Sequence, residues 1–257
     1  MGRPQLAPLA PLTRLAGSVV PVTELSDRDV DQMFAVHAGL YEHVSERDFR
    51  RDLDEKNWVL VLRDAPDGEI RGFTTILLFE TEVQGERLRA VFSGDTGIDA
   101  AFWGSQALAR AWGHFMGELL ARQSDRRLFW FLISKGYRTY LYLPVFFHAF
   151  YPRVGAPTPR FERELIDRLG ALKYPRDFNP RTGVIEFAES HGHLKPELAH
   201  VPAHRREHPH VRFFLQRNPG YVRGHELVCV AEISPANLKE RARRMVLAGR
   251  DALVAAS

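Results

Sequence analysis

One segment, the apolar run from Leu128 to Ile133, constrains the fold more than any other part of the sequence. It holds leucine, phenylalanine, tryptophan and isoleucine without a polar interruption. A short run of this kind is typical of a β-strand that is buried on both faces. The preceding segment, Ser105 to Gln123, repeats apolar side chains at helical spacing. Because a strand buried on both faces needs a covering layer on each side, the pattern predicts a layered α/β fold.

Turn-forming residues divide the rest of the chain into alternating strands and helices. Pro66-Asp67-Gly68 and Gln84-Gly85-Glu86 have the composition of tight turns. The expected strands cover residues 19–25, 58–62, 71–82, 88–98 and 226–233. The expected helices cover residues 26–40, 46–54, 137–151 and 237–254, and Ser26 is the expected N-cap of the first. Residues 157–217 are expected to be mostly helical and irregular.

The composition favours a single domain. A chain of 257 residues is long for one domain but long enough to bury a core, and its 45% hydrophobic and 26% charged residues are the usual globular balance. There is no internal repeat. We therefore expect a mobile N-terminal tail over residues 1–15 and one domain over residues 16–257. Within that domain, residues 157–217 form a helical insertion before the last strand.

The cysteine content and the N-terminal segment bear on the compartment. The chain has one cysteine, Cys229, which lies in an apolar run and has no partner for an internal disulfide. Pro4, Pro8 and Pro11 interrupt the apolar stretch at the N-terminus, so it lacks the core of a signal peptide. No apolar run is long enough to span a bilayer. These features predict a cytoplasmic protein without a membrane span.

The charge distribution leaves several classes of partner open. The formal net charge is +3, and the lysines and arginines alternate with acids along the chain. The segment around Arg243-Arg244 could serve a nucleic acid, but amphipathic helix surfaces commonly look the same. A nucleotide cofactor or an acidic carrier protein would suit this charge equally well.

The segment from Gly97 to Leu108 joins an expected strand to an expected helix. Such a junction leaves backbone N–H groups without partners at the positive end of the helix, where they can bind a phosphate or pyrophosphate. An ordinary strand–helix junction has the same local pattern. Short glycine motifs alone do not separate the two interpretations.

This segment resembles the core motif of the GNAT acyltransferase superfamily. Ile98 matches its aliphatic position, Phe102 its aromatic position and Gly104 its first glycine, whereas Trp103 stands where an arginine or glutamine is common. The order of strands and helices is also that of the family. The resemblance implies a mixed, mostly antiparallel sheet with splayed strands, flanked by helices and followed by an elaborated C-terminal helical part.

The resemblance also implies a co-substrate, with no prosthetic group. Acyl-CoA, or an acyl-phosphopantetheine on an acyl-carrier protein, would bind at the junction. The residues that correspond to this site are Gly97, Ile98, Trp103, Gly104, Ser105, Gln106 and Ala107. The segment His148 to Gly155 resembles the family segment whose tyrosine protonates the departing thiolate. That match gives the role to Tyr151 and makes His148 a tentative substrate contact.

Acyl transfer to an amine also needs a base, and Asp95 is the leading candidate. Ser93-Gly94-Asp95-Thr96-Gly97 is unusual within a buried strand, where branched apolar residues are expected. A bulge or an Asx-stabilised turn is the alternative explanation for these residues. Glu80 and Glu82 on the neighbouring strand are possible substitutes. Ser134 and Lys135 follow the buried strand directly, where α/β sheets commonly contact their ligands.

Other chemistries have weaker sequence support. The histidines between residues 191 and 210 fit no zinc-binding spacing, so we expect no metal site there. Neither a G-x-S-x-G motif nor a phosphate-binding P-loop motif is present in the sequence. We expect an N-acyltransferase; the alternatives are a non-catalytic acyl-thioester or carrier-binding module and a nucleic-acid-binding protein. The sequence leaves the acceptor, the acyl length and the oligomeric state open.

Overall fold

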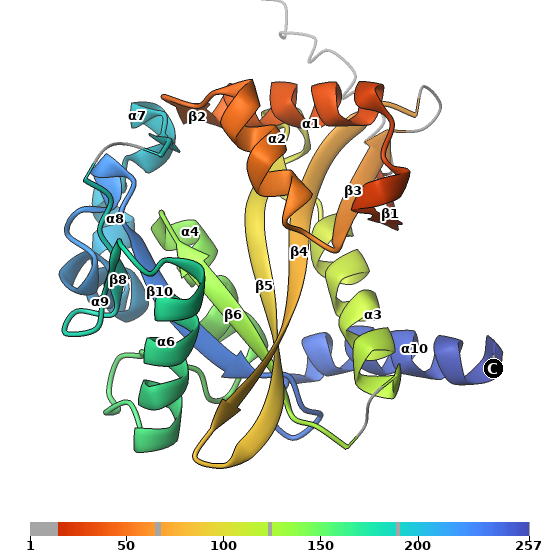
Figure 1. Ribbon diagram of the computed structural model, residues 1–257. Coiled ribbons are helices and arrows are strands. Elements are labelled where there is room, and N and C mark those ends of the chain that lie inside the picture. The colour runs from red at the N-terminus through yellow and green to blue at the C-terminus, as the bar shows by residue number, and fades with distance from the viewer. Residues whose placement is uncertain (1–14, 65–67, 123–124, 189–190, 257) are drawn as a thin grey trace, which may run out of the picture.

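The computed structural model describes residues 15–64, 68–122, 125–188 and 191–256, with side chains up to residue 253. These residues form an eight-stranded sheet in the order β1-β3-β4-β5-β6-β10-β8-β7. Figure 1 shows β4 and β5 as a long twisted hairpin at its centre. The strands of this sheet are β1 (Leu15–Pro21), β3 (Trp58–Asp64), β4 (Ile70–Val83), β5 (Glu86–Ile98), β6 (Leu128–Ser134), β7 (Phe178–Asn179), β8 (Val184–Ile185) and β10 (Glu226–Glu232).

The sheet is mixed and mostly antiparallel, as the resemblance implied. Within the described residues, β5 and β6 are the one parallel pair, and every other neighbouring pair of this sheet is antiparallel. The ladder between β5 and β6 ends at Ser93 and Leu132, although β5 continues to Ile98. The two strands therefore splay apart, and Figure 1 shows them diverging.

Helices cover both faces of the sheet. They are α1 (Asp27–Leu40), α2 (Glu46–Asp54), α3 (Ala107–Arg122), α4 (Tyr137–Tyr140), α5 (Tyr142–Phe146), α6 (Arg160–Lys173), α7 (Pro196–Ala199), α8 (Ala203–Arg206), α9 (Pro209–Arg217) and α10 (Glu240–Ala256). Successive side chains of β3 point alternately into the two layers. Val59 packs with the helices α1 and α2, whereas Leu60 packs with α3. Ser26 caps α1 as expected, because its hydroxyl accepts a hydrogen bond from the backbone N–H of Asp29.

The face that carries α3 also carries α10. A side-chain carbon at Gly117 would lie 1.9 Å from the carbonyl oxygen of Val246, so glycine is required where these helices touch. Trp112, Phe115 and Met116 form the stripe of α3 that packs onto the sheet. The opposite face is covered by α1 and α2 over one part of the sheet and by α6 over another.

The C-terminal part differs from the expected helical insertion. Besides its helices it contributes β7 and β8, which extend the main sheet at the edge of β10. A third short strand, β9 (His193–Leu194), pairs with β2 (Tyr41–Glu42) at the end of α1. Strands of only two residues leave almost no periodic pattern in the sequence, which is why the sequence did not predict them.

The expected aromatic helix over residues 137–151 is interrupted. It consists of α4 and α5, followed by an extended segment. Pro144 cannot donate a backbone hydrogen bond to the carbonyl of Tyr140, so a continuous helix is not available there. The predicted tail and the turn at Pro66-Asp67 fall largely outside the described residues. No helix among the described residues is long and apolar enough to cross a membrane.

Candidate functional site

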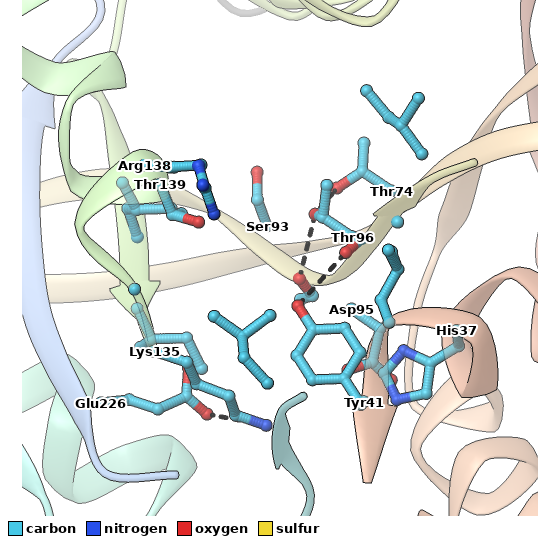
Figure 2. Close-up of a pocket in the computed structure, with 18 of the residues that line it drawn as sticks. His37, Tyr41, Thr74, Ser93, Asp95, Thr96, Lys135, Arg138, Thr139 and Glu226 are labelled. Atoms are coloured by element: carbon cyan, nitrogen blue, oxygen red, sulfur yellow. Dashed lines mark hydrogen bonds and ion pairs between the residues drawn. The ribbon is translucent and has the colours of Figure 1, made fainter. Parts of the chain in front are cut away.

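A cavity of about 870 Å³ opens where β5 and β6 diverge. It is lined from both faces of the sheet, because the missing ladder leaves a gap between the layers. The lining residues on the α3 side include Ser105, Leu108, Trp112, Trp130, Leu132 and Phe146. Those on the α1, α2 and α6 side include His37, Tyr41, Phe49, Asp52, Phe92 and Tyr174. Figure 2 shows the polar residues around the split.

The unpaired end of β5 carries a β-bulge. The register with β4 shifts between Thr74 and Ile76, which pair with Thr96 and Ser93 respectively. Two residues of β5 thus oppose one residue of β4, and the alternation of side chains changes at this point. A side-chain carbon at Gly94 would lie 2.6 Å from the Thr75 hydroxyl oxygen, so only glycine fits the bulge.

The bulge places Ser93 and Asp95 on opposite faces of the sheet. Ser93 lies on the α3 face, where it contacts two tryptophans of that layer. Asp95 lies on the α1 face, where its carboxylate interacts electrostatically with His37. Both residues line the cavity, and Figure 2 shows them extending to different sides of β5. The bulge that was the alternative explanation for these residues is thus present, and it directs Asp95 to the α1 side of the cavity.

The C-terminal end of α1 supplies a histidine and a tyrosine to the cavity. His37 is only 5% exposed and stacks on Tyr41, with 4.5 Å between ring centroids. Burial lowers the pKa of His37, although the charge of Asp95 opposes this shift, so the imidazole is neutral near pH 7. The Tyr41 hydroxyl donates to the backbone carbonyl of Thr96 at 3.4 Å and thereby contacts the unpaired part of β5.

A second carboxylate faces the split from the side of β6. Glu226, the first residue of β10, is 6% exposed, and its carboxylate lies 3.5 Å from the Lys135 ammonium. Burial raises the pKa of Glu226 to about 7; Lys135 lowers it and Asp95 raises it further. Two carboxylates on neighbouring walls of the cavity can bind or deprotonate a cationic amine.

The junction between β5 and α3 forms another wall. Gly97, Ile98, Trp103, Gly104 and Ser105 line the cavity, and they are five of the seven residues that the resemblance assigns to the thioester. The indole N–H of Trp103 donates to the Ile98 carbonyl at 2.9 Å, so its ring folds back over the loop. Gly104 has a φ of 92°, a conformation that glycine adopts without strain.

Two members of the predicted phosphate-binding set lie outside the cavity. Gln106 and Ala107 are absent from its lining, and Ala107 is buried in the core as the first residue of α3. The Ser105 hydroxyl accepts a hydrogen bond from the Ala107 backbone N–H at 3.2 Å. That N–H therefore already has a partner within the helix cap.

Tyr151 does not lie beside Asp95. It is not part of the cavity lining but lines a smaller cavity with Phe129, Val230 and Glu232. Its backbone forms a bridge with Val230, on the edge of β10 away from β6. The strands β6 and β10 thus separate Tyr151 from β5, because the segment after α5 runs along the far edge of β10.

Three tentative substrate residues also lie elsewhere. Glu80 is far along β4 and pairs with Arg126 at 3.0 Å. Ser134 is buried beside the cavity without being part of its lining, and His148 is exposed at a turn that bonds to Asn237. Lys135 is the one member of the predicted substrate set that lines the cavity. Glu82, the other proposed substitute for Asp95, is exposed and near Arg87.

The sequence reasoning missed His37, Tyr41 and Glu226. His37 and Tyr41 end an amphipathic helix, where they look like ordinary core and boundary residues. Glu226 gave a usable signal, since a carboxylate at the start of an apolar strand must be exposed, paired or functional. Among the described residues, no group of three or more histidines, cysteines or carboxylates is arranged to hold a metal ion.

No family model matches the sequence, and no curated protein does. Solved structures that are similar include a probable N-acyltransferase of unknown function from Enterococcus faecalis (16% identity, TM-score 0.39, covering 52% of this chain and 33% of that one). Another is the GNAT family N-acetyltransferase YhbS from Escherichia coli in complex with CoA (22% identity, TM-score 0.36, covering 55% of this chain and 72% of that one).

A third similar structure is an acetyltransferase from Trypanosoma brucei (14% identity, TM-score 0.39, covering 57% of this chain and 98% of that one). The present chain thus spans about a third of the length of the Enterococcus protein. Its own strand order, its parallel pair β5–β6 and the splay beyond Ser93 and Leu132 give the described part of this chain a GNAT-like fold.

Proposed function

We propose that this protein transfers an acyl group from an acyl thioester, carried by CoA or by an acyl-carrier protein, to an amine. The observation that carries this proposal is the splay of β5 and β6 beside Asp95. Within the described residues, the edge of β5 that faces β6 has no strand partner beyond Ser93. A ligand can therefore reach its backbone polar groups other than the Thr96 and Ile98 carbonyls, which already accept hydrogen bonds from Tyr41 and Trp103. An extended pantetheine arm can bind such an edge much as a strand would.

The two faces of the cavity suit the two substrates. The thioester enters from the α3 side past Trp103 and Gly104, and the amine enters from the side of α1 and α2. In this arrangement the thioester carbonyl lies in the split between the strands. The amine then approaches it from the face that carries Asp95.

Asp95 is assigned as the base. Its carboxylate takes a proton from the ammonium form of the acceptor, and the free amine attacks the thioester carbonyl carbon. The new C–N bond forms as the carbonyl electrons move to oxygen. The C–S bond then breaks, and the second proton of the nitrogen passes to the departing sulfur. Products are the amide and the free thiol.

Thermal unfolding with CoA tests the donor site. A ligand at one hundred times its dissociation constant stabilises the folded protein by about 2.7 kcal/mol. We expect Gly104→Ala to remove this stabilisation, since φ there is 92° and a side chain would displace the loop. Gly85→Ala is the matched control: its φ is 81° in the β4–β5 turn, and it does not line the cavity.

Release of free thiol from an acyl thioester in the presence of amines tests turnover. Acyl transfer gives thiol and amide in equal amounts, whereas a non-catalytic acyl-thioester module binds the thioester and releases neither. If CoA compounds and acyl-carrier proteins all leave the wild-type melting curve unchanged, the thioester site itself is wrong.

A further inference from the structure

Ser93 is held in an unusual hydrogen-bonding state at the point where the strands separate. Its hydroxyl oxygen accepts the indole N–H of Trp130 at 2.9 Å and that of Trp112 at 3.3 Å. An indole nitrogen can only donate, and a serine hydroxyl has two acceptor positions and one proton. Both acceptor positions are therefore occupied, and the hydroxyl can offer only its proton.

Among the described residues, no protein group accepts a hydrogen bond from the Ser93 hydroxyl. Within the described residues, the two indole contacts are the hydrogen bonds that involve the Ser93 hydroxyl. The side chain is nevertheless buried, with 6% of the residue exposed, and it lines the cavity. A buried donor without an acceptor costs about 1–3 kcal/mol, so such a group is expected to meet its partner in a ligand.

Its position relative to Asp95 identifies the ligand atom. Ser93 and Leu132 form the last pair between β5 and β6, and the bulge sends Asp95 to the opposite face. A carbonyl group in the split can direct its oxygen toward the α3 face while an amine from the Asp95 side approaches its carbon from above the carbonyl plane. The tryptophan pair fixes the serine on that second face, with ring centroids 4.6 Å apart.

We propose that Ser93 donates its hydroxyl hydrogen bond to the thioester carbonyl oxygen and stabilises the negative charge that develops there. This inference rests on the proposed acyl transfer. The proton stays on Ser93 throughout: the carbonyl electrons move to oxygen during attack and return when the C–S bond breaks. A donor already oriented by Trp112 and Trp130 needs no rearrangement during the reaction, which is the condition for effective charge stabilisation.

Ser93→Ala tests the proposal. Loss of one such donor costs about 10²-fold in kcat, with little change in the Kd of the acyl thioester. Ser93→Thr retains the hydroxyl and is expected to keep most of the activity. Thr81→Val is the matched control, because Thr81 is a hydroxyl residue of β4 that pairs with Leu88, away from the bulge, and does not line the cavity. Its kcat should be unchanged.

A catalytic role of Ser93 must be distinguished from a purely structural one, since Ser93→Ala also leaves two indole N–H groups without an acceptor. A thioester labelled with ¹³C at the carbonyl provides the second readout. On binding to the wild type, a hydrogen bond to oxygen lowers the carbonyl stretching frequency, and Ser93→Ala should abolish this shift. Trp112→Phe with Trp130→Phe should weaken the shift, although neither ring donates to the substrate.

The outcomes are distinct. Loss of the frequency shift together with the fall in kcat supports the assignment. An active wild type whose Ser93→Ala variant folds and retains both kcat and the shift overturns the role of Ser93 but not the acyltransferase. An unstable Ser93→Ala variant transfers the test to the two-tryptophan variant, where an unaltered carbonyl frequency overturns the proposal. If the wild-type protein binds no acyl thioester, the proposed function itself is wrong.

Discussion

The two halves of β5 differ in pairing and in composition. From Arg89 to Ser93 the strand has β4 on one side and β6 on the other, and its buried side chains alternate between the two cores. From Gly94 to Ile98 it keeps β4 alone, and its small polar residues line the cavity. A strand paired on both sides needs apolar side chains to stabilise the sheet, whereas the half without β6 can hold polar groups for a ligand.

The largest effect is expected in the apolar part of β5 that leads into the paired half. Leu88 lies one residue before Arg89, is 1% exposed and packs in the core beneath α6. Leu88→Ala should reduce the free energy of unfolding by about 2–5 kcal/mol, through lost burial and a cavity. Denaturant titration gives this value, and kcat per folded molecule should be nearly unchanged. A large fall in kcat of the folded variant would show that the two halves are not separable.

Asp95→Asn should have the opposite profile. Loss of the base is expected to lower kcat by about 10²-fold near pH 7, with partial recovery at a pH where the amine loses its proton unaided. Because Asp95 lies on the unpaired half and no ion pair at 4 Å or less joins it to another described residue, the melting temperature should change little. Steady-state rates across pH check this. Activity equal to that of the wild type would remove Asp95 from the mechanism.

The same contrast explains what the sequence could predict. The apolar run Leu128 to Ile133 and the regular spacing of α3 reflect burial, which leaves a periodic pattern, and their strand and helix are confirmed. Ser93 to Gly97 stood out because polar residues interrupt a strand. Tyr151 was assigned by a motif alone, and its position depends on how the segment after α5 meets β10, which no local pattern encodes.

The pH dependence of the free energy of unfolding tests Glu226, on the other wall of the split. Its pKa is raised to about 7, so between pH 4.5 and pH 7 the folded state binds more protons than the unfolded state. Stability from this group is therefore present at low pH and is lost as pH rises through about 7. The free energy of unfolding of Glu226→Gln should match that of the wild type near pH 4.5 and exceed it by roughly 3 kcal/mol at pH 8. Parallel stability curves for the two proteins would contradict this account.

Tyr151→Phe is expected to have the smallest effect. The family motif gives Tyr151 the role of proton donor to the thiolate, and in that role its loss would lower kcat by roughly 10²-fold. The structure places it on the far edge of β10, with its ring about 5.5 Å from the Arg153 guanidinium and outside the cavity that Asp95 lines. A change so far from the reacting atoms should alter kcat by about twofold or less, or roughly 0.5 kcal/mol. The kcat of Tyr151→Phe, measured with a substrate whose chemical step limits the rate, decides between the hundredfold and the twofold expectation. A hundredfold loss would mean that the segment from Phe147 to Val154 rearranges when the thioester binds, so that the unpaired half of β5 would not be the whole of the catalytic site.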